Sequence, residues 1–175
     1  MSAVEQAIGC EKEIGAFPDT TNGLRAWIQM NEVVGYQLSD ELLQIAYQIA
    51  IDGWRARAKE RGNSSPIDLS GSCKFSTLFV KSIFGGAVQG NKDHQYNVID
   101  GIVVDLNAGS QDIKGMTDKG IDVYRHDELF FGNEDHLASM LSCVGRVKDW
   151  KSQFERLANA QNPEELVRAL AKPDV

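Results

Sequence analysis

Residues 94–107 read HQYNVIDGIVVDLN, and this stretch decides the fold because an Asp-Gly pair separates two runs rich in β-branched residues. An Asp-Gly pair in this setting is the strongest short signal for a β-hairpin with a two-residue turn. With Asp100 and Gly101 in the turn, Ile99 pairs with Ile102 and the two strands run antiparallel. The sequence therefore predicts a small antiparallel sheet built around this hairpin.

The same register decides which polar side chains of the hairpin share a face. Side chains alternate along a strand, so His94, Tyr96, Asp105 and Asn107 are expected on one face. Asn107 would lie directly opposite His94, and Asp105 diagonal to it; diagonal neighbours about 7–8 Å apart still meet through longer side chains. Either residue can therefore orient the imidazole, whereas a register shift of one residue would move Asp105 to the opposite face.

Cys73 stands where a helix is expected to begin. Apolar side chains recur at helical spacing from Cys73 to Phe84, and Gly85 follows as a terminator. The unpaired amides and the dipole of a helix N-terminus favour a thiolate, and the amide of Cys73 can donate to an oxyanion. This position therefore suits a nucleophile. The alternative is a buried, inert thiol, which is the common state of a free cysteine.

Residues 70–112 carry a set of short motifs: Cys73-Lys-Phe-Ser76-Thr77, Phe84-Gly85-Gly86, His94-Gln-Tyr-Asn97-Val-Ile-Asp100-Gly101, Val104-Asp105-Leu106 and Gln111. Together they resemble the YunG-like small bacterial proteins, compact members of the papain and transglutaminase-like cysteine-enzyme superfamily. The resemblance implies an α+β fold with a papain-like core, in which the helix that bears the nucleophile packs on a small antiparallel sheet between flanking helices.

The resemblance also implies a role for each matching position. Cys73 would be the nucleophile, His94 the base and Asp105 the orienting acid. Asn97 belongs to the matching pattern but lies on the other strand face in the predicted register, so it receives no such role. Ser72 stands where the family pattern has Gln, which leaves the side-chain part of an oxyanion hole without a candidate.

The expected function is that of a thiol hydrolase or acyltransferase acting on an amide-type bond. A peptidase, an amidase, a deamidase and a transglutaminase-like enzyme all fit, and the expected partner is a peptide or another amide-containing substrate, with no cofactor. The alternative is a catalytically inactive binding or regulatory module that keeps the fold, because fold does not imply function. A third possibility is an interaction protein that uses the amphipathic helices from Asn133 onward.

The rest of the chain is expected to add helices within a single domain of 175 residues. One helix should start after the N-cap Ser39 and end at Gly62, and another should follow Asn133 with a break at Gly145. A short C-terminal helix should follow Asn162. Residues 1–38 form an N-terminal extension whose structure the sequence leaves open, apart from a possible helix over 24–34; residues 108–132 form a mixed segment, and residues 133–175 hold the C-terminal helices.

Composition limits the partners and the compartment. Hydrophobic residues make up 42 % of the chain, and the formal net charge of −7 disfavours nucleic acid and anionic membranes as partners. The first residues lack a secretory pattern and no apolar run is long enough to span a bilayer, so the expected location is cytoplasmic, with leaderless export as the alternative. The cysteines Cys10, Cys73 and Cys143 show no zinc or disulfide spacing, and His126 with His136 lacks a metal-binding spacing.

Overall fold

The hairpin forms in the register that the sequence predicts. In the computed structural model, which describes residues 16–33 and 35–160, strand β2 (Gln95–Ile99) pairs antiparallel with β3 (Ile102–Val104). Ile99 lies opposite Ile102. Asp100 and Gly101 have φ values of 51° and 76°, so both turn residues are left-handed, as a two-residue turn that follows the strand twist requires.

A third strand completes the sheet. Strand β1 (Ala87–Gly90) pairs antiparallel with β2, from Ala87 opposite Val98 to Gly90 opposite Gln95, and the strand order is β1-β2-β3. The side chain of Asn91 organises the connection between β1 and β2. Its Oδ1 accepts the backbone N–H groups of Asp93 at 2.8 Å and of His94 at 3.1 Å. The turn therefore fixes the backbone of His94 just before β2 begins.

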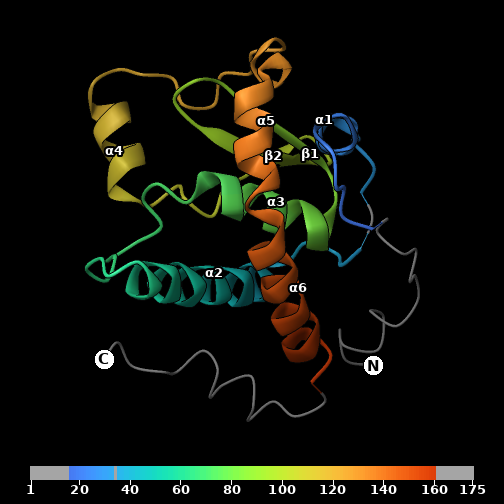
Figure 1. Ribbon diagram of the computed structural model, residues 1–175, viewed down its shortest axis with the longest axis vertical. Helices are drawn as coiled ribbons and strands as arrows, with labels where there is room; N and C mark the ends of the chain where they lie inside the picture. The colour runs from blue at the N-terminus through green and yellow to red at the C-terminus, as the bar shows by residue number, and fades with distance from the viewer. Residues whose placement is uncertain (1–15, 34, 161–175) are drawn as a thin grey trace.

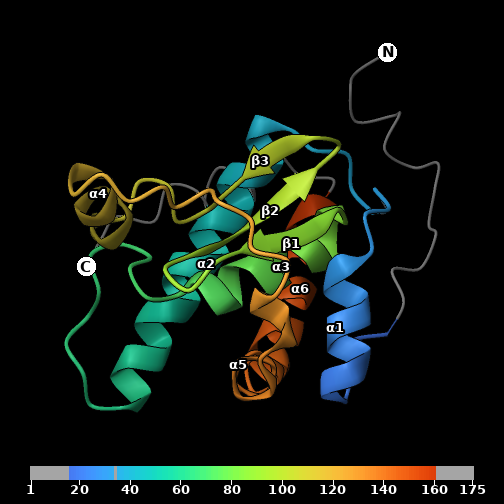
Figure 2. The ribbon, with the colours of Figure 1, turned by 90° about the horizontal axis from the view of Figure 1, so that it is seen from above.

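Helix α3 (Cys73–Phe84) has the predicted bounds and is the central element of the fold. Every residue from Phe75 to Phe84 is buried, because the helix packs against β1 and β2 on one side and against α2 and α6 on the other. Figure 2 shows α3 between the sheet and the layer of helices below it. A helix that is covered on all sides needs apolar residues around most of its circumference, which this sequence supplies.

The flanking helices form a layer around α3 (Figure 1). Helix α1 (Thr21–Gln29) contacts β1 and α5, while α2 (Asp40–Glu60) and α6 (Val144–Ala158) contact each other and α3. Helix α2 follows the predicted N-cap Ser39, whose side chain accepts the N–H of Leu42 at 3.2 Å. None of the described helices is long and apolar enough to cross a membrane.

The C-terminal part differs from the prediction in one place. Helix α5 (Glu134–Leu141) begins at the predicted cap Asn133, but the break that follows lies at Ser142 and Cys143, and Gly145 lies inside α6. The Ser142 hydroxyl donates to the carbonyl of Ser139 at 2.6 Å, so a side chain competes for the backbone acceptors where the helix ends. The helix expected after Asn162 lies outside the described residues, as does Cys10.

The segment 108–132 contains two helices that the sequence did not predict, α4 (Gln111–Asp118) and the short 3-10 helix η1 (Phe130–Gly132). Six α-helices and a three-stranded antiparallel sheet in the described residues make the fold α+β.

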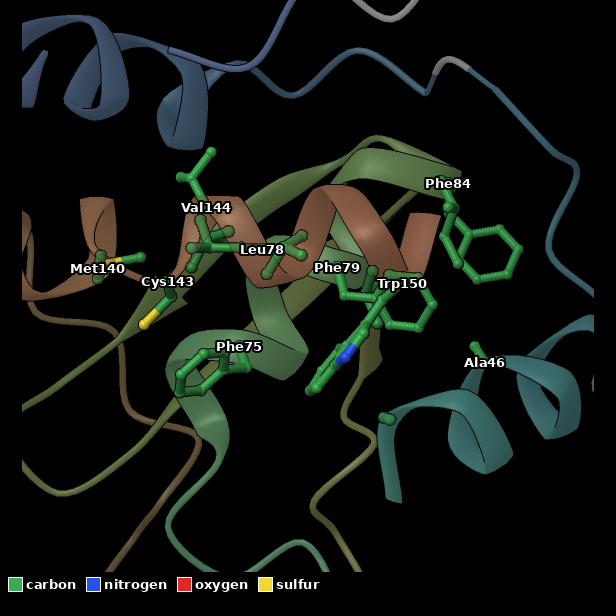
Figure 3. Close-up of a cluster of buried hydrophobic side chains, with 14 of the residues drawn as sticks. Ala46, Phe75, Leu78, Phe79, Phe84, Met140, Cys143, Val144 and Trp150 are labelled. Atoms are coloured by element: carbon green, nitrogen blue, oxygen red, sulfur yellow. The ribbon is translucent and has the colours of Figure 1, made fainter. Parts of the chain in front are cut away.

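The core lies where α3, α2 and α6 meet (Figure 3). The fully buried ring of Trp150 packs against Phe75 and Phe79, with ring centroids 5.9 and 5.6 Å apart. Trp27 is also buried, and the partly buried Trp54 packs on Phe75 at 5.5 Å. The three tryptophans therefore serve packing. Phe75 lies two residues after Cys73, so this core anchors the first turn of α3.

Candidate functional site

Cys73 is the first residue of α3, and its side chain is partly exposed as a free thiol. Gly71, two residues before Cys73, has a φ of 77°, which turns the chain sharply toward the helix. The carbonyl of Cys73 accepts the Thr77 hydroxyl at 2.8 Å. The thiol therefore lies on a rigid helix start with access to solvent, unlike the buried Cys143. The alternative hypothesis for Cys73 was a buried, unreactive thiol, but its side chain is only partly buried.

His94 and Asp105 are brought together by the hairpin, as the predicted face-sharing requires. His94 Nε2 lies 2.8 Å from Asp105 Oδ2, and the two side chains are 2 % and 3 % exposed. His94 precedes β2 and Asp105 follows β3, so each lies one residue beyond a strand end. Asp105, which was expected diagonal to His94 on the same face of the hairpin, is thus in direct contact with it.

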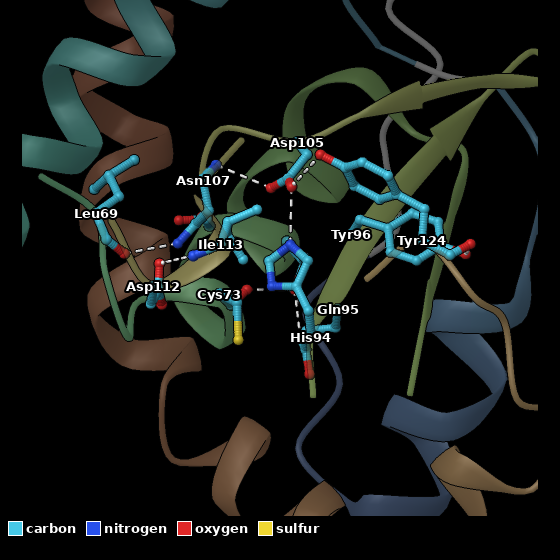
Figure 4. A network of polar contacts seen from close by, with 12 residues as sticks. Leu69, Cys73, His94, Gln95, Tyr96, Asp105, Asn107, Asp112, Ile113 and Tyr124 are labelled. Carbon is cyan, nitrogen blue, oxygen red and sulfur yellow. Dashed lines mark hydrogen bonds and ion pairs between the residues drawn. The ribbon is translucent and has the colours of Figure 1, made fainter. Parts of the chain in front are cut away.

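Cys73 lies beside the imidazole of His94, on the other side of the ring from Asp105 (Figure 4). Burial by itself lowers the pKa of His94, but hydrogen bonds to Asp105 and Cys73, together with the negative charges of both, raise it to about 9. Since Nε2 is engaged by Asp105, Nδ1 is the ring nitrogen left for Cys73. An imidazolium between a carboxylate and a thiol is the arrangement that favours a thiolate.

The carboxylate of Asp105 is held by two further donors. The backbone N–H of Asn107 donates to Oδ1 at 2.9 Å, and the Tyr124 hydroxyl donates to Oδ2 at 3.0 Å. Burial, followed by the charge of Asp105 and this hydrogen bond, raises the pKa of Tyr124 to about 12, so the phenol stays a donor at neutral pH. The carboxylate therefore has a fixed position, and His94 has a fixed partner.

Tyr124 is a site residue that no motif or spacing in the sequence singles out. It lies in the connection between α4 and η1, where no periodic pattern stands out. Its backbone carbonyl accepts the hydroxyl of Tyr96 at 2.8 Å, and the two rings meet edge to face at 5.3 Å. Tyr96 was predicted on the face of His94, which could have indicated an aromatic partner there. The partner itself comes from a segment far along the chain.

Asn107, the alternative orienting residue, does not contact His94. Its Nδ2 donates to the carbonyl of Leu69 at 2.7 Å and to Ser72 Oγ at 3.1 Å. The reason is that β3 ends at Val104, so the pairing that would have set Asn107 opposite His94 is not formed. Asn107 instead anchors the loop that leads into α3.

Two polar residues of β2 face α3, away from Asp105. Asn97 Nδ2 donates to the carbonyl of Thr77 at 2.9 Å, and Gln95 Nε2 donates to Thr77 Oγ1 at 2.6 Å. Asn97 therefore lies on the other strand face, as predicted, and serves to dock the sheet on the helix.

Ser72 does not replace the missing Gln of the family pattern. Its side chain is buried, and its hydroxyl donates to the carbonyl of Leu69 at 2.7 Å and lies 3.1 Å from the Ser76 hydroxyl. Because it points inward, it supplies no donor to an oxyanion next to Cys73. Backbone amides at the start of α3 are then the donors available there.

The loop before Cys73 is fastened to the start of α4. The N–H of Gly71 donates to Asp112 Oδ2 at 2.8 Å, and the N–H of Asp112 donates back to the Ser70 hydroxyl at 3.2 Å. In addition, the N–H of Gln111 donates to Asp68 Oδ2 at 2.9 Å. These reciprocal bonds cap α4 and hold the backbone shortly before Cys73, so α4 fastens the loop that leads to the thiol.

The remaining candidates serve other purposes. Among the described residues, no three His, Cys, Asp or Glu side chains group as a metal site. His136 Nε2 instead lies 2.9 Å from Gln95 Oε1, and its ring packs on Phe130 at 4.4 Å. In α2, the guanidinium of Arg57 lies over the ring of Trp54 at 5.1 Å, which is a packing contact.

Comparison with known proteins adds no relative. A scan against protein-family models finds no match, and searches of the curated proteins and of the solved structures find none either. The family resemblance of the motifs therefore stays a prediction.

Proposed function

We propose that this protein is a cysteine-dependent hydrolase or acyltransferase that acts on an amide-type carbonyl, with Cys73 as nucleophile. His94 would be the general base and acid, and Asp105 would orient the imidazole. The support is the buried contact of His94 with Asp105 at 2.8 Å, with the partly exposed Cys73 on the other side of the ring.

One geometric observation carries the proposal: the imidazole of His94 lies between the Asp105 carboxylate, 2.8 Å from Nε2, and Cys73. The pKa of His94 agrees with this arrangement. The pKa of His94, lowered by burial but raised by its partners Asp105 and Cys73, reaches about 9. A neutral imidazole in an apolar setting would have its pKa lowered, so the partners outweigh burial. At neutral pH the ring is then protonated next to a thiol, and a thiolate–imidazolium pair is the nucleophilic form of such enzymes. A histidine with a purely structural role would need only Asp105 as its partner, and not Cys73 as well.

The proposed reaction begins with attack of the Cys73 thiolate on the carbonyl carbon, which forms a C–S bond and an oxyanion. Backbone amides at the start of α3 would stabilise that oxyanion. The His94 imidazolium then gives its proton to the leaving amine as the C–N bond breaks, and a thioester remains. Water or an amine attacks the thioester while His94 accepts its proton, and Cys73 leaves as thiolate.

The arrangement of elements agrees with this proposal. The nucleophile lies at the start of a buried helix, and this helix packs on an antiparallel sheet whose strand ends carry the base and the acid. This arrangement resembles a smaller version of a papain-like core. On that basis we propose that the chain is a YunG-like protein of the papain and transglutaminase-like superfamily. The flanking helices α2 and α6 would support the nucleophile helix from the side opposite the sheet.

A second candidate, an inactive binding or regulatory module with the same fold, is favoured by Ser72. Its inward-pointing hydroxyl leaves no side-chain donor for an oxyanion beside Cys73. Losing one such donor typically costs about 100- to 1000-fold in rate, which leaves a slow enzyme or none. The reactivity of the thiol separates the two candidates.

The test is the pH dependence of Cys73 alkylation by iodoacetamide, read at each cysteine by mass spectrometry. An enzyme predicts rapid alkylation of Cys73 well below pH 8.5, the usual pKa of a free cysteine, and loss of that reactivity in His94→Ala. His126→Ala, which removes an exposed histidine, is the matched control and should leave the profile unchanged.

Cys143 provides an internal comparison because burial raises the pKa of its thiol, despite a hydrogen bond and two cations that lower it. Cys143 should therefore be alkylated slowly at every pH below the raised pKa of its thiol. A Cys73 profile that rises only near pH 8.5, in the wild type as in His94→Ala, would contradict the enzyme and favour the binding module.

A further inference from the structure

The buried side chain of Gln95, the residue directly after His94, is bonded both to the nucleophile helix α3 and to α5. Its Nε2 donates to Thr77 Oγ1 of α3 at 2.6 Å, and its Oε1 lies 2.9 Å from His136 Nε2 of α5. The Thr77 hydroxyl in turn donates to the backbone carbonyl of Cys73 at 2.8 Å. These polar groups form one continuous chain that begins at His136 and ends at the residue proposed as nucleophile.

The direction of each hydrogen bond in this chain follows from its end at Cys73. A threonine hydroxyl has one hydrogen, and Thr77 donates it to the Cys73 carbonyl, so its oxygen accepts from Gln95. The Gln95 oxygen then faces His136, whose Nε2 carries the hydrogen. Burial, followed by the charge of Lys74, lowers the pKa of His136, so the ring is neutral and a single tautomer fits. A satisfied buried network of this kind makes the elements that it joins rigid.

The backbone that carries Gln95 is also held firmly. Strand β1 approaches so closely that a Cβ on Gly90 would lie 2.6 Å from the His94 carbonyl oxygen and 2.7 Å from the Cα of Gln95. The backbone N–H of Asn91 donates to the same carbonyl at 2.9 Å, and its side chain accepts the N–H of His94 at 3.1 Å. The backbone that places the imidazole of His94 therefore also places the amide of Gln95.

We propose that Gln95 is a positioning residue, which acts through Thr77 to hold the nucleophile Cys73 against its base. This inference rests on the proposed function of Cys73 and His94. The two reacting side chains come from a helix and from a strand, so their separation depends on how the helix start is fixed to the strand. A misplacement of about 1 Å between reacting groups can cost about 100-fold in rate, so a contact that fixes this separation matters for the reaction.

The rival role for Gln95 is general docking of the sheet on α3, and Asn97 makes the comparison possible. Asn97 lies on the same face of β2 and also donates to Thr77, at 2.9 Å, but to its backbone carbonyl. Carbonyls point toward the C-terminal end of a helix, so this contact leads away from Cys73. Gln95 and Asn97 are each 1 % exposed, so removing either amide takes away a comparably buried hydrogen bond.

The experiment measures Cys73 alkylation by iodoacetamide in the wild type, Gln95→Met, Thr77→Val, Thr77→Ser and the control Asn97→Leu. The rate constant about two pH units below 8.5, the usual pKa of a free cysteine, is divided by the alkaline plateau of the same variant. This ratio reports the fraction of Cys73 held as thiolate, which a loss of folding stability alone does not change in a folded protein.

We expect the ratio to fall about tenfold in Gln95→Met and in Thr77→Val, as for a displacement of less than about 1 Å. Thr77→Ser keeps the hydroxyl and should keep most of the ratio. Asn97→Leu should lower the unfolding temperature but keep the wild-type ratio. Thermal unfolding shows that each variant is folded at the temperature of the alkylation. If Gln95→Met does not fold, Thr77→Val breaks the same chain at its next contact and carries the test.

Two results would overturn the inference. One is an unchanged ratio in a folded Gln95→Met or Thr77→Val. The other is an equal fall in Asn97→Leu, which would assign the effect to docking of the sheet as a whole. In both cases a wild-type Cys73 that reacts at the lower pH leaves the proposed function standing and rejects the role of Gln95 alone. A wild-type Cys73 that does not react there rejects the proposed function, and this inference with it.

Discussion

The Tyr124 hydroxyl donates to Asp105 Oδ2 at 3.0 Å. The same oxygen lies 2.8 Å from His94 Nε2, so the phenol and the imidazole share one acceptor atom. A donor on a carboxylate oxygen withdraws part of the negative charge that the other donor feels. Tyr124 is therefore expected to moderate the effect of Asp105 on His94 while fixing the position of the carboxylate.

Tyr124→Phe should separate these two effects. Removing the hydroxyl leaves the ring on Tyr96 but strips one donor from Asp105, so the pKa of His94 should rise while the alkylation rate of Cys73 falls by a few fold through looser positioning. Imidazole titration by NMR gives the pKa. Tyr96→Phe, which retains the donor to Asp105, should shift this pKa less. A lower pKa in Tyr124→Phe would contradict the shared-acceptor account.

The pKa of His94 should depend on both of its partners. Burial lowers it and Asp105 and Cys73 raise it, to about 9, so either Asp105→Asn or Cys73→Ser should bring it down, and Asp105→Asn more strongly because the hydrogen bond to Asp105 is the largest of the raising effects. The same NMR titration reads each variant. A His94 pKa that stays near 9 without Asp105 would place the origin of the shift elsewhere.

The raised pKa also predicts how stability varies with pH. A histidine whose folded pKa lies above its unfolded value of 6.5 stabilises the folded state fully below pH 6.5, and this contribution is lost as the pH rises to about 9. The difference in unfolding free energy between wild type and His94→Gln should therefore shrink across that window, by at most about 3 kcal/mol. Urea unfolding at several pH values measures it, and a constant difference would contradict the shift.

The sequence was sufficient where local signals dominate. The Asp100-Gly101 turn set the register of β2 and β3, and that register placed His94 and Asp105 on one face. The bounds of α3 were also readable, because an apolar helical pattern ends at Gly85. The α+β class follows from these two elements together with the flanking helices.

The sequence was insufficient where contacts far along the chain decide the structure. The first amides of helix α4 are bonded by Asp68 and Ser70 from another loop, while the side chain of its N-cap residue Ser110 makes no capping hydrogen bond. Tyr124 reaches Asp105 from a segment held by contacts far along the chain, in which Tyr96 donates to the carbonyl of Tyr124 and Asn91 donates to those of Asp122 and Arg125. The end of β3 at Val104 likewise removed Asn107 from the face that the extended ladder would have given it.

Gly53 should respond to alanine in the opposite way to an ordinary helix glycine. It lies within α2, and a Cβ there would overlap the indole ring of Trp150. Alanine normally stabilises a helix interior by about 1 kcal/mol, but here the clash should cost about 1–3 kcal/mol. Gly115→Ala in α4, where a Cβ meets nothing within 4 Å, is the control and should stabilise. Chemical denaturation measures the unfolding free energy of each variant. An equal increase in Gly53→Ala and Gly115→Ala would show that the Trp150 ring moves aside at no cost.

Lys81 should govern stability at alkaline pH. It is 3 % exposed, and its Nζ donates to the carbonyls of Met30, at 2.7 Å, and of Gly86. It therefore ties the end of α1 to the end of α3. Lys81→Met leaves both carbonyls without their donor and should destabilise the protein by about 1–3 kcal/mol at pH 7.

The pH dependence of that loss tests the charge of Lys81. Burial lowers its pKa to about 8, although the charge of Glu32 raises it, whereas an unfolded lysine keeps a pKa of 10.5. Below pH 8 the lysine is protonated in both states and the folded state carries the full cost of burying the charge. Between pH 8 and 10.5 the folded state releases its proton first, so the stability of wild type relative to Lys81→Met should rise. A relative stability that stays flat or falls in this window would mean that Lys81 titrates as an exposed lysine does.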